Sequence, residues 1–204
     1  METKGIIFDL GGVVFNYSFD NAFKIWAQEI GVSYETIKSN FKFTSDFEKF
    51  ERNDISSSQF NEALSKQLNS RLNHANFEKG WNSIYKDIIP NIDNLLIQLK
   101  QNYRLVALTN TNITHAKVWF DKYRDVLSHF EKIFTSYDIR SRKPESKAFK
   151  TVLTYLNIEP HQAIFLDDNE EYTLSAKQLG LKTIWVKSYG QMIKELKDFE
   201  INLD

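Results

Sequence analysis

Near its amino end the chain reads Ile6-Ile7-Phe8-Asp9-Leu10-Gly11-Gly12-Val13-Val14, and this stretch decides the fold. A short, continuous apolar run that ends in one carboxylate is typical of a buried parallel strand. The two glycines that follow permit a tight turn in which backbone amides approach a ligand. Asp9 would then lie at the carboxyl end of its strand, where open α/β sheets bind ligands. Alternatively, Asp9 only caps the turn, and the rest of the chain has to decide between these interpretations.

From residue 90 onward, helical and strand patterns alternate along the chain. Apolar runs predict strands at residues 104–110, 132–136, 163–168 and 182–186. Amphipathic spacing predicts helices at residues 92–99, 114–128, 145–156, 170–179 and 189–199. Strands that alternate with helices indicate an α/β fold with a doubly wound, Rossmann-like parallel sheet.

Residues 17–88 have a different character, because they contain no clear buried strand. The spacing of their apolar residues predicts helices over residues 19–30, 54–68 and 77–85. We therefore expect a small helical bundle inserted between the first strand and the rest of the sheet. Most of its aromatic residues are expected in its core, but one or two could face a site. The candidates are Phe41, Phe43, Phe47, Trp81 and Tyr85.

The composition narrows the class of protein. The 204 residues include 42% hydrophobic and 26% charged side chains with a net charge of -1, which is ordinary for a globular domain. This balance does not indicate a nucleic-acid or membrane partner. The absence of cysteine excludes disulfides and thiolate metal sites. Because no signal-peptide pattern precedes the first strand, we expect a soluble, cytoplasmic protein that acts on a small molecule.

Polar residues follow three of the predicted strands. Asp9 ends the first, Thr109-Asn110 the second and Asp167-Asp168 the fourth, while Lys143 belongs to a basic segment between strands. Because the carboxyl ends of parallel strands share one edge of a sheet, these side chains can converge. Mg²⁺ prefers such oxygen ligands and commonly shares them with a phosphate. Mg²⁺ and a lysine would neutralise the phosphate, so that an anionic carboxylate can attack it.

With these residues in view, the chain resembles the haloacid dehalogenase superfamily. Four segments are similar, in order and spacing, to the four motifs of that superfamily: Phe8–Val13, Leu108–Asn110, Arg142–Pro144 and Phe165–Asn169. The helical insertion stands where one branch of the superfamily carries a helical cap. The resemblance implies a Rossmann-like core over residues 1–16 and 89–204, with strand order 3-2-1-4-5, and a small helical cap over residues 17–88.

The resemblance also implies a nucleophile and a metal site. Asp9 would be the nucleophile, forming an aspartyl-phosphate that water later hydrolyses. Asp9 and Asp168 would bind Mg²⁺ through their side chains, and Gly11 would bind it through its backbone carbonyl. Asp167 would support the metal shell.

Three further residues would act on the phosphate. Thr109 and Asn110 would hold its oxygens, and Lys143 would bridge phosphate and nucleophile. The implied activity is Mg²⁺-dependent hydrolysis of a small phosphomonoester. In the insertion, Phe50-Glu51-Arg52 and Gly80-Trp81 resemble segments of the glucose-1-phosphate phosphatases of this superfamily. A sugar phosphate such as glucose 1-phosphate is therefore the implied substrate.

One position departs from the superfamily's pattern. Its phosphatases usually carry a second aspartate two residues after the nucleophile, which protonates the leaving group, and here that position is Gly11. General acid–base catalysis is worth roughly 10²–10⁴-fold, so hydrolysis would be slow, confined to good leaving groups, or assisted by another group or by water. Two alternatives stay open. One is a haloacid dehalogenase that attacks carbon through Asp9 without Mg²⁺, and the other is a non-catalytic protein that binds phosphate and Mg²⁺ without turnover.

Overall fold

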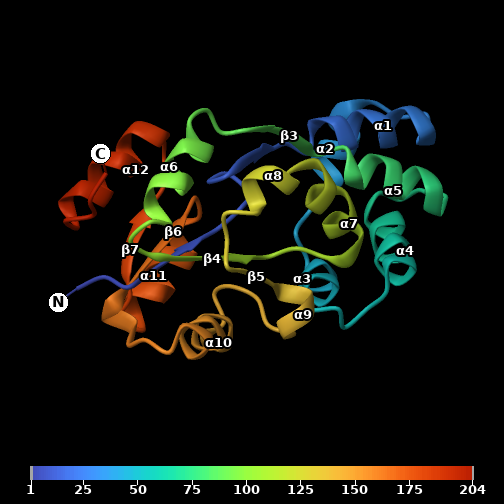
Figure 1. The fold of residues 1–204 in the computed structure, drawn as a ribbon. Helices are drawn as coiled ribbons and strands as arrows, with labels where there is room; N and C mark the ends of the chain where they lie inside the picture. Colours follow the sequence, from blue (N-terminus) through green and yellow to red (C-terminus); the bar gives the residue numbers. More distant parts are fainter. Residues whose placement is uncertain (1, 204) are drawn as a thin grey trace.

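A computed structural model describes residues 2–203 of the chain. Its centre is a five-stranded parallel sheet with the strand order β5-β4-β1-β6-β7 (Figure 1). Numbered along the chain, this order is 3-2-1-4-5, so the expected α/β fold and strand order are confirmed. The strands are β1 (Gly5–Phe8), β4 (Arg104–Thr109), β5 (Lys132–Thr135), β6 (Ala163–Asp167) and β7 (Lys182–Trp185).

Strand β1 lies in the middle of the sheet because its residues are apolar towards both faces. Ile6 is paired with Leu105 on β4 and with Ile164 on β6. Successive side chains of a strand point to opposite faces, so Ile6 packs in one hydrophobic cluster and Ile7 in another. The next residue, Asp9, is held to β6 by its N–H, which donates to the carbonyl of Leu166 at 2.8 Å. The central strand therefore places Asp9 in the middle of the sheet's carboxyl edge.

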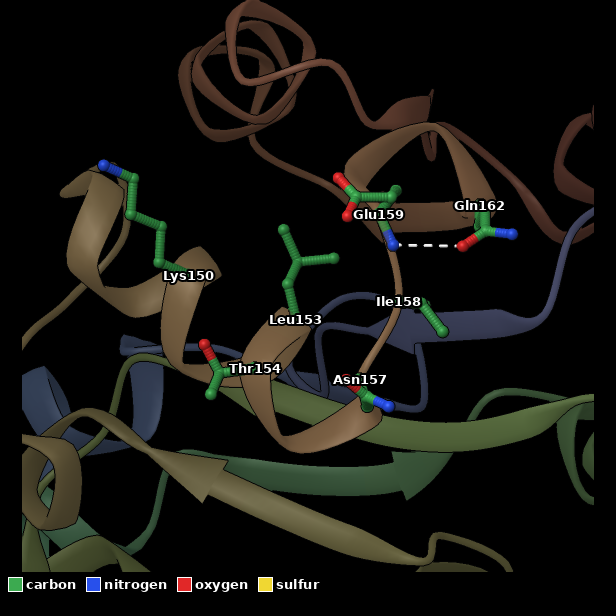
Figure 2. Close-up of a pocket in the computed structure, with 7 residues that line it drawn as sticks. All are labelled: Lys150, Leu153, Thr154, Asn157, Ile158, Glu159 and Gln162. Carbon is green, nitrogen blue, oxygen red and sulfur yellow. Dashed lines mark hydrogen bonds between the residues drawn. The ribbon is translucent and has the colours of Figure 1, made fainter.

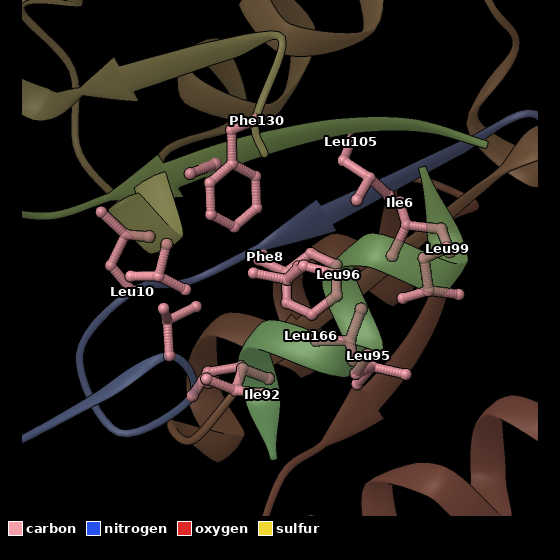
Figure 3. Packing of buried hydrophobic residues seen from close by; sticks show 14 of the residues in the cluster. Ile6, Phe8, Leu10, Ile92, Leu95, Leu96, Leu99, Leu105, Phe130 and Leu166 are labelled. Carbon is pink, nitrogen blue, oxygen red and sulfur yellow. The ribbon is translucent and has the colours of Figure 1, made fainter. Parts of the chain in front are cut away.

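Helices cover both faces of the sheet. On one face Ile6 and Phe8 meet the leucines of α6, as Figure 3 shows. On the other face Ile7 and Phe165 pack with Phe149 of α10. The helices of this part of the chain are α6 (Ile92–Leu99), α7 (Ile113–Lys122), α8 (Arg124–Leu127), α9 (Ser136–Ile139), α10 (Ser146–Leu156), α11 (Glu170–Gln178) and α12 (Tyr189–Asp198), with a 3₁₀ turn η1 (Pro160–Gln162).

The helical block between the first two strands of the sheet packs around a hydrophobic cluster of its own. Trp26 and Trp81 are fully buried in it and stack with their ring centroids 6.1 Å apart. A Cβ atom on Gly80 would lie 2.2 Å from Trp26 Nε1, so only glycine allows this approach. The block lies beside the sheet (Figure 1). Its helices are α1 (Asp20–Ile30), α2 (Tyr34–Asn40), α3 (Ser45–Glu51), α4 (Ser57–Gln67) and α5 (His74–Asn82).

The main difference from the sequence-based expectation lies where this block joins the sheet. Strands β2 (Phe15–Tyr17) and β3 (Tyr85–Ile88) pair antiparallel, with Tyr17 opposite Tyr85. The helix expected over residues 77–85 instead ends at Asn82. The two strands are short and their partners are far apart in the sequence, so a local pattern could not reveal them.

Two smaller features also differ or are new. The helix expected over residues 114–128 is divided at Tyr123 into α7 and α8. Helices α2 and α3 had no predicted counterpart, because each spans only seven residues. Within residues 2–203, no helix combines the length and the apolar character that a bilayer crossing requires.

Candidate active site

The carboxyl edge of the sheet brings the predicted site residues together. Lys143, which precedes α10, reaches the ends of two strands with its ammonium group. Its Nζ atom lies 2.9 Å from Asp9 Oδ1 and 2.6 Å from Asp167 Oδ2. Lys143 has no exposed surface. Although burial lowers it, the pKa of Lys143 is raised above its ordinary value by Asp167 and Asp9, so the side chain stays charged.

Three carboxylates gather at this point. Asp9, Asp167 and Asp168 each offer an oxygen atom, and these atoms all lie within 4.8 Å of one another. Burial, followed by the charge of Asp9, raises the pKa of Asp168 to about 6. One lysine cannot neutralise three carboxylates, and excess buried charge is costly without a cation. An all-oxygen donor set with surplus negative charge fits Mg²⁺.

The two adjacent aspartates differ in what they contact. Asp167 has no exposed surface, and both of its oxygens have partners: Oδ2 accepts from Lys143 Nζ, and Oδ1 accepts from the Asn169 N–H at 2.8 Å. Asp168 is less enclosed and lies against Gly12. A Cβ atom on Gly12 would lie 2.1 Å from Asp168 Oδ2, and Gly12 has φ +74°. Glycine is thus required at position 12 both by the close approach and by the positive φ. Because both oxygens of Asp167 already have partners, Asp168 is better placed than Asp167 to ligate a metal.

Thr109 and Asn110 follow the same edge but have different surroundings. The amide group of Asn110 makes two hydrogen bonds to the backbone of Lys143. Its Nδ2 donates to the carbonyl of Lys143 at 3.0 Å, and its Oδ1 accepts from the Lys143 N–H at 2.8 Å. Asn110 therefore positions Lys143, and its expected contact with phosphate stays a prediction. Thr109 is buried and lines the site, and no hydrogen bond within residues 2–203 engages its hydroxyl.

A cavity of about 430 Å³ lies over these residues. Asp9, Gly11, Thr109, Lys143 and Asp168 form its polar side. The remaining wall is largely aromatic and includes Tyr17, Phe19, Phe43, Phe47, Tyr85 and Tyr172. Among the aromatic candidates from the sequence, Phe43, Phe47 and Tyr85 thus line the cavity, whereas Phe41 and Trp81 pack in the hydrophobic cluster of the helical block.

The sequence did not single out Glu51, the last residue of α3, as a site residue. Glu51 is 5% exposed and lines the cavity from the side of the helical block. Its Oε2 accepts from Arg142 Nε at 2.8 Å, and Arg142 also donates to Glu48 Oε1 at 3.3 Å and to the hydroxyl of Tyr172 at 3.1 Å. Because Glu51 and Arg142 are 91 positions apart, no local pattern could have paired them.

His115 on α7 joins the helical block to the sheet. Its ring stacks on Trp81 with the centroids 4.6 Å apart, and its Nε2 lies 3.0 Å from the carbonyl of Trp81. Burial lowers the pKa of His115 to about 3, so the ring is neutral. His115 therefore has a packing role at this junction.

A separate depression of about 560 Å³ lies between the end of α10 and the turn before β6 (Figure 2). It is at the amino end of β6, whereas Asp167 is at the carboxyl end of that strand. Its Glu159 N–H donates to Gln162 Oε1 at 3.0 Å, which stabilises the local turn. The depression is therefore not part of the site described above.

Comparison with known proteins identifies the family. The profile of haloacid dehalogenase-like hydrolases matches residues 6–186. D-ribitol-5-phosphate phosphatase from Bacteroides thetaiotaomicron is 22% identical over 199 residues, which cover 95% of this chain and 96% of that protein. A HAD family enzyme from Bacteroides thetaiotaomicron, solved in complex with magnesium and inorganic phosphate, is 28% identical with a TM-score of 0.77 and covers 92% of this chain and 96% of its own. A HAD-like family hydrolase from Porphyromonas gingivalis shares the fold over the full length of both chains, with a TM-score of 0.80 at 21% identity. The chain belongs to the haloacid dehalogenase-like hydrolases.

Proposed function

We propose that this hydrolase is a Mg²⁺-dependent phosphatase that releases phosphate from a small phosphomonoester. The observation that carries the proposal is the buried Lys143 between Asp9 and Asp167, with Asp168 beside them. A carboxylate can attack a phosphate dianion only where other charges offset the repulsion. Two relatives support the proposal: one is named D-ribitol-5-phosphate phosphatase, and the other was solved with magnesium and inorganic phosphate.

In the proposed mechanism, Asp9 attacks phosphorus and forms an aspartyl-phosphate, which water then hydrolyses. Lys143 neutralises charge on Asp9 and on the phosphoryl oxygens, and the hydroxyl of Thr109 donates to one of those oxygens. Asn110 keeps Lys143 in place through its two backbone hydrogen bonds.

The metal site follows from the same cluster. Asp9, Asp168 and the carbonyl of Gly11 would hold Mg²⁺, while Asp167 orders the site through Lys143 and the Asn169 N–H. When bound, the ion neutralises charge on the transferring phosphoryl group. Gly11 lines the same cavity as Asp9 and Asp168.

We also propose separate roles for two parts of the chain. Residues 1–16 and 89–204 would form the core that carries the chemistry, and residues 17–88 would form a cap that selects the substrate. A cavity of about 430 Å³ suits a small phosphorylated metabolite. A sugar or polyol phosphate is the proposed class, with glucose 1-phosphate and ribitol 5-phosphate as the first members to test.

The carboxylate cluster also favours the phosphatase over the dehalogenase alternative. A dehalogenase that attacks carbon through Asp9 has no need of a cation, whereas three clustered carboxylates favour one. The expectations of a cytoplasmic location and of no nucleic-acid or membrane partner stay predictions.

The test is release of inorganic phosphate from p-nitrophenyl phosphate, glucose 1-phosphate and ribitol 5-phosphate, with Mg²⁺ and after treatment with EDTA. We expect release that EDTA abolishes and Mg²⁺ restores. Halide release from a 2-haloacid that persists in EDTA would establish a dehalogenase instead. Binding of inorganic phosphate without turnover of any ester would establish a non-catalytic protein.

A further inference from the structure

The loop after Asp9 supplies no acid to the leaving group. Gly11 stands where a second carboxyl group is usual, and the ring of Tyr17 fills the space beside it. A Cβ atom on Gly11 would lie 3.1 Å from Tyr17 Cε1 and 3.2 Å from Tyr17 Cδ1, which is close contact. An alkoxide leaving group still needs a proton, so the donor has to come from another part of the cavity.

Glu51 is another carboxyl group that lines the same cavity. Its neighbour Phe50 is buried in the helical block, so the turn of α3 directs Glu51 towards the sheet edge. Only one of its oxygens has a protein partner: Oε2 accepts from Arg142 Nε at 2.8 Å. No hydrogen bond within residues 2–203 reaches Oε1. This atom is also not fully buried, so it keeps some accessible surface. Glu51 therefore presents a free oxygen to the cavity that contains Asp9.

The surroundings of Glu51 suit proton transfer. Burial raises the pKa of Glu51 to about 7, against the opposing charges of Arg142 and Lys143 and with a smaller contribution from Asp9. A carboxyl group is an effective acid and base when both of its protonation states are populated at the working pH. The other titratable groups near it are Glu48 on the same helix and His115, Asp168, Glu171, Tyr17, Tyr85 and Tyr172 along the cavity.

We propose that Glu51 is the general acid, and then the general base, of the proposed phosphatase reaction. As Asp9 bonds to phosphorus and the bond from phosphorus to the alcohol oxygen breaks, Glu51 gives its proton to that oxygen. In the second step, water attacks the aspartyl-phosphate, its proton passes to the Glu51 carboxylate, and the bond between phosphorus and Asp9 breaks. The alcohol and inorganic phosphate leave, Asp9 is again a carboxylate, and Glu51 is again protonated.

The test uses Glu51→Gln, which keeps the size of the side chain and an oxygen for Arg142 but cannot donate the acid proton. Ribitol 5-phosphate has a poor leaving group, and p-nitrophenyl phosphate has a good one. We expect kcat/KM for ribitol 5-phosphate to fall about 10²-fold or more, within the roughly 10²–10⁴-fold range of general acid catalysis, and kcat/KM for p-nitrophenyl phosphate to fall much less. The pH profile of kcat/KM for the alkyl ester should lose its basic limb near neutral pH.

The matched control is Glu48→Gln. Glu48 lies one turn earlier on α3 and also pairs with Arg142, but it is only half-buried and does not line the cavity. If Glu51 acted only by holding Arg142 and the helical block in place, both variants would lower the two activities in parallel. We expect Glu48→Gln to leave the ratio of the two activities unchanged.

A second measurement needs no variant. With an acid in place, kcat/KM of the native enzyme should depend weakly on the leaving-group pKa across a series of aryl and alkyl phosphates. A steep decline, or an unchanged activity ratio in Glu51→Gln, would overturn the role of Glu51 while the phosphatase activity itself stands. Absence of Mg²⁺-dependent turnover for every ester tested would overturn the proposed function instead.

Discussion

The two walls of the cavity are built in opposite ways. At the sheet edge two polar side chains have fixed partners: Lys143 binds two carboxylates, and Asn110 binds both backbone groups of Lys143. On the facing wall, aromatic rings contact one another, and Phe43 packs on Phe47 with the centroids 4.8 Å apart while 64% of its surface stays exposed. Fixed charges suit a transition state that is the same for every ester, whereas an apolar wall suits the variable part of the substrate.

The largest effect is expected at the sheet edge, for Asp9→Asn. The amide keeps an oxygen for Lys143 but is a poor nucleophile, so kcat should fall on the order of 10⁶-fold. Phosphate release measured on both p-nitrophenyl phosphate and a sugar phosphate checks this, with circular dichroism as the control for folding. Substantial turnover by the folded variant would contradict the role of Asp9 and remove the contrast between the walls.

The metal gives the next largest effect, and it separates two neighbours on one strand end. Asp168→Ala should weaken Mg²⁺ binding by more than about 100-fold, and Asp167→Ala by roughly 10–100-fold, because Asp167 already has partners for both oxygens. Titration of activity with Mg²⁺ after removal of metal by EDTA measures both affinities. A larger loss of Mg²⁺ affinity for Asp167→Ala than for Asp168→Ala would make Asp167 the metal ligand instead of Asp168.

Substitutions on the aromatic wall should change substrate preference more than turnover. For Phe43→Ala and Phe47→Ala, we expect kcat/KM for a sugar phosphate to change about 10-fold relative to p-nitrophenyl phosphate. Leu174→Ala is the control, because Leu174 is 53% exposed on α11 and lies outside the cavity. Parallel losses on both substrates would show that this wall takes part in the chemistry and not in selection.

The smallest effect concerns stability at the junction of the two regions. The pKa of His115 is about 3 in the folded protein and 6.5 in the unfolded chain, so between these values the unfolded state binds more protons. The contribution of His115 to stability is therefore lost as the pH falls below 6.5, by about 1.4 kcal/mol at pH 5.5.

His115→Phe keeps the ring against Trp81 but cannot bind a proton. Urea unfolding at pH 7.5 and 5.5 measures the free energy of unfolding of the native protein and of His115→Phe. The difference between these two free energies should be about 1.4 kcal/mol smaller at pH 5.5 than at pH 7.5. The raised pKa values of the buried carboxyl groups affect both proteins alike and cancel in the difference. A constant difference would mean that His115 is accessible to protons in the folded state.

The sheet edge was largely predictable from the sequence, and the facing wall was not. Asp9, Thr109 and Asp167 follow apolar runs, and the geometry of a parallel sheet carries such residues to one edge without further information. Glu51 meets Arg142 only because α3 packs beside the segment before α10, and the pairing of β2 with β3 likewise joins distant residues. The role of Asn110 also depends on a long-range contact, since its partner Lys143 is 33 positions away.

The antiparallel pair formed by β2 and β3 makes the helical block replaceable. The chain leaves the two-stranded sheet at Tyr17 and returns to it at Tyr85, and these residues face each other across a ladder in which opposite Cα atoms are about 4.5–5.5 Å apart. A two-residue hairpin turn spans that gap, so residues 18–84 occupy a position that a short turn could fill. A lineage of such enzymes could therefore exchange the block proposed to select the substrate while the sheet edge that carries Asp9 remained unchanged.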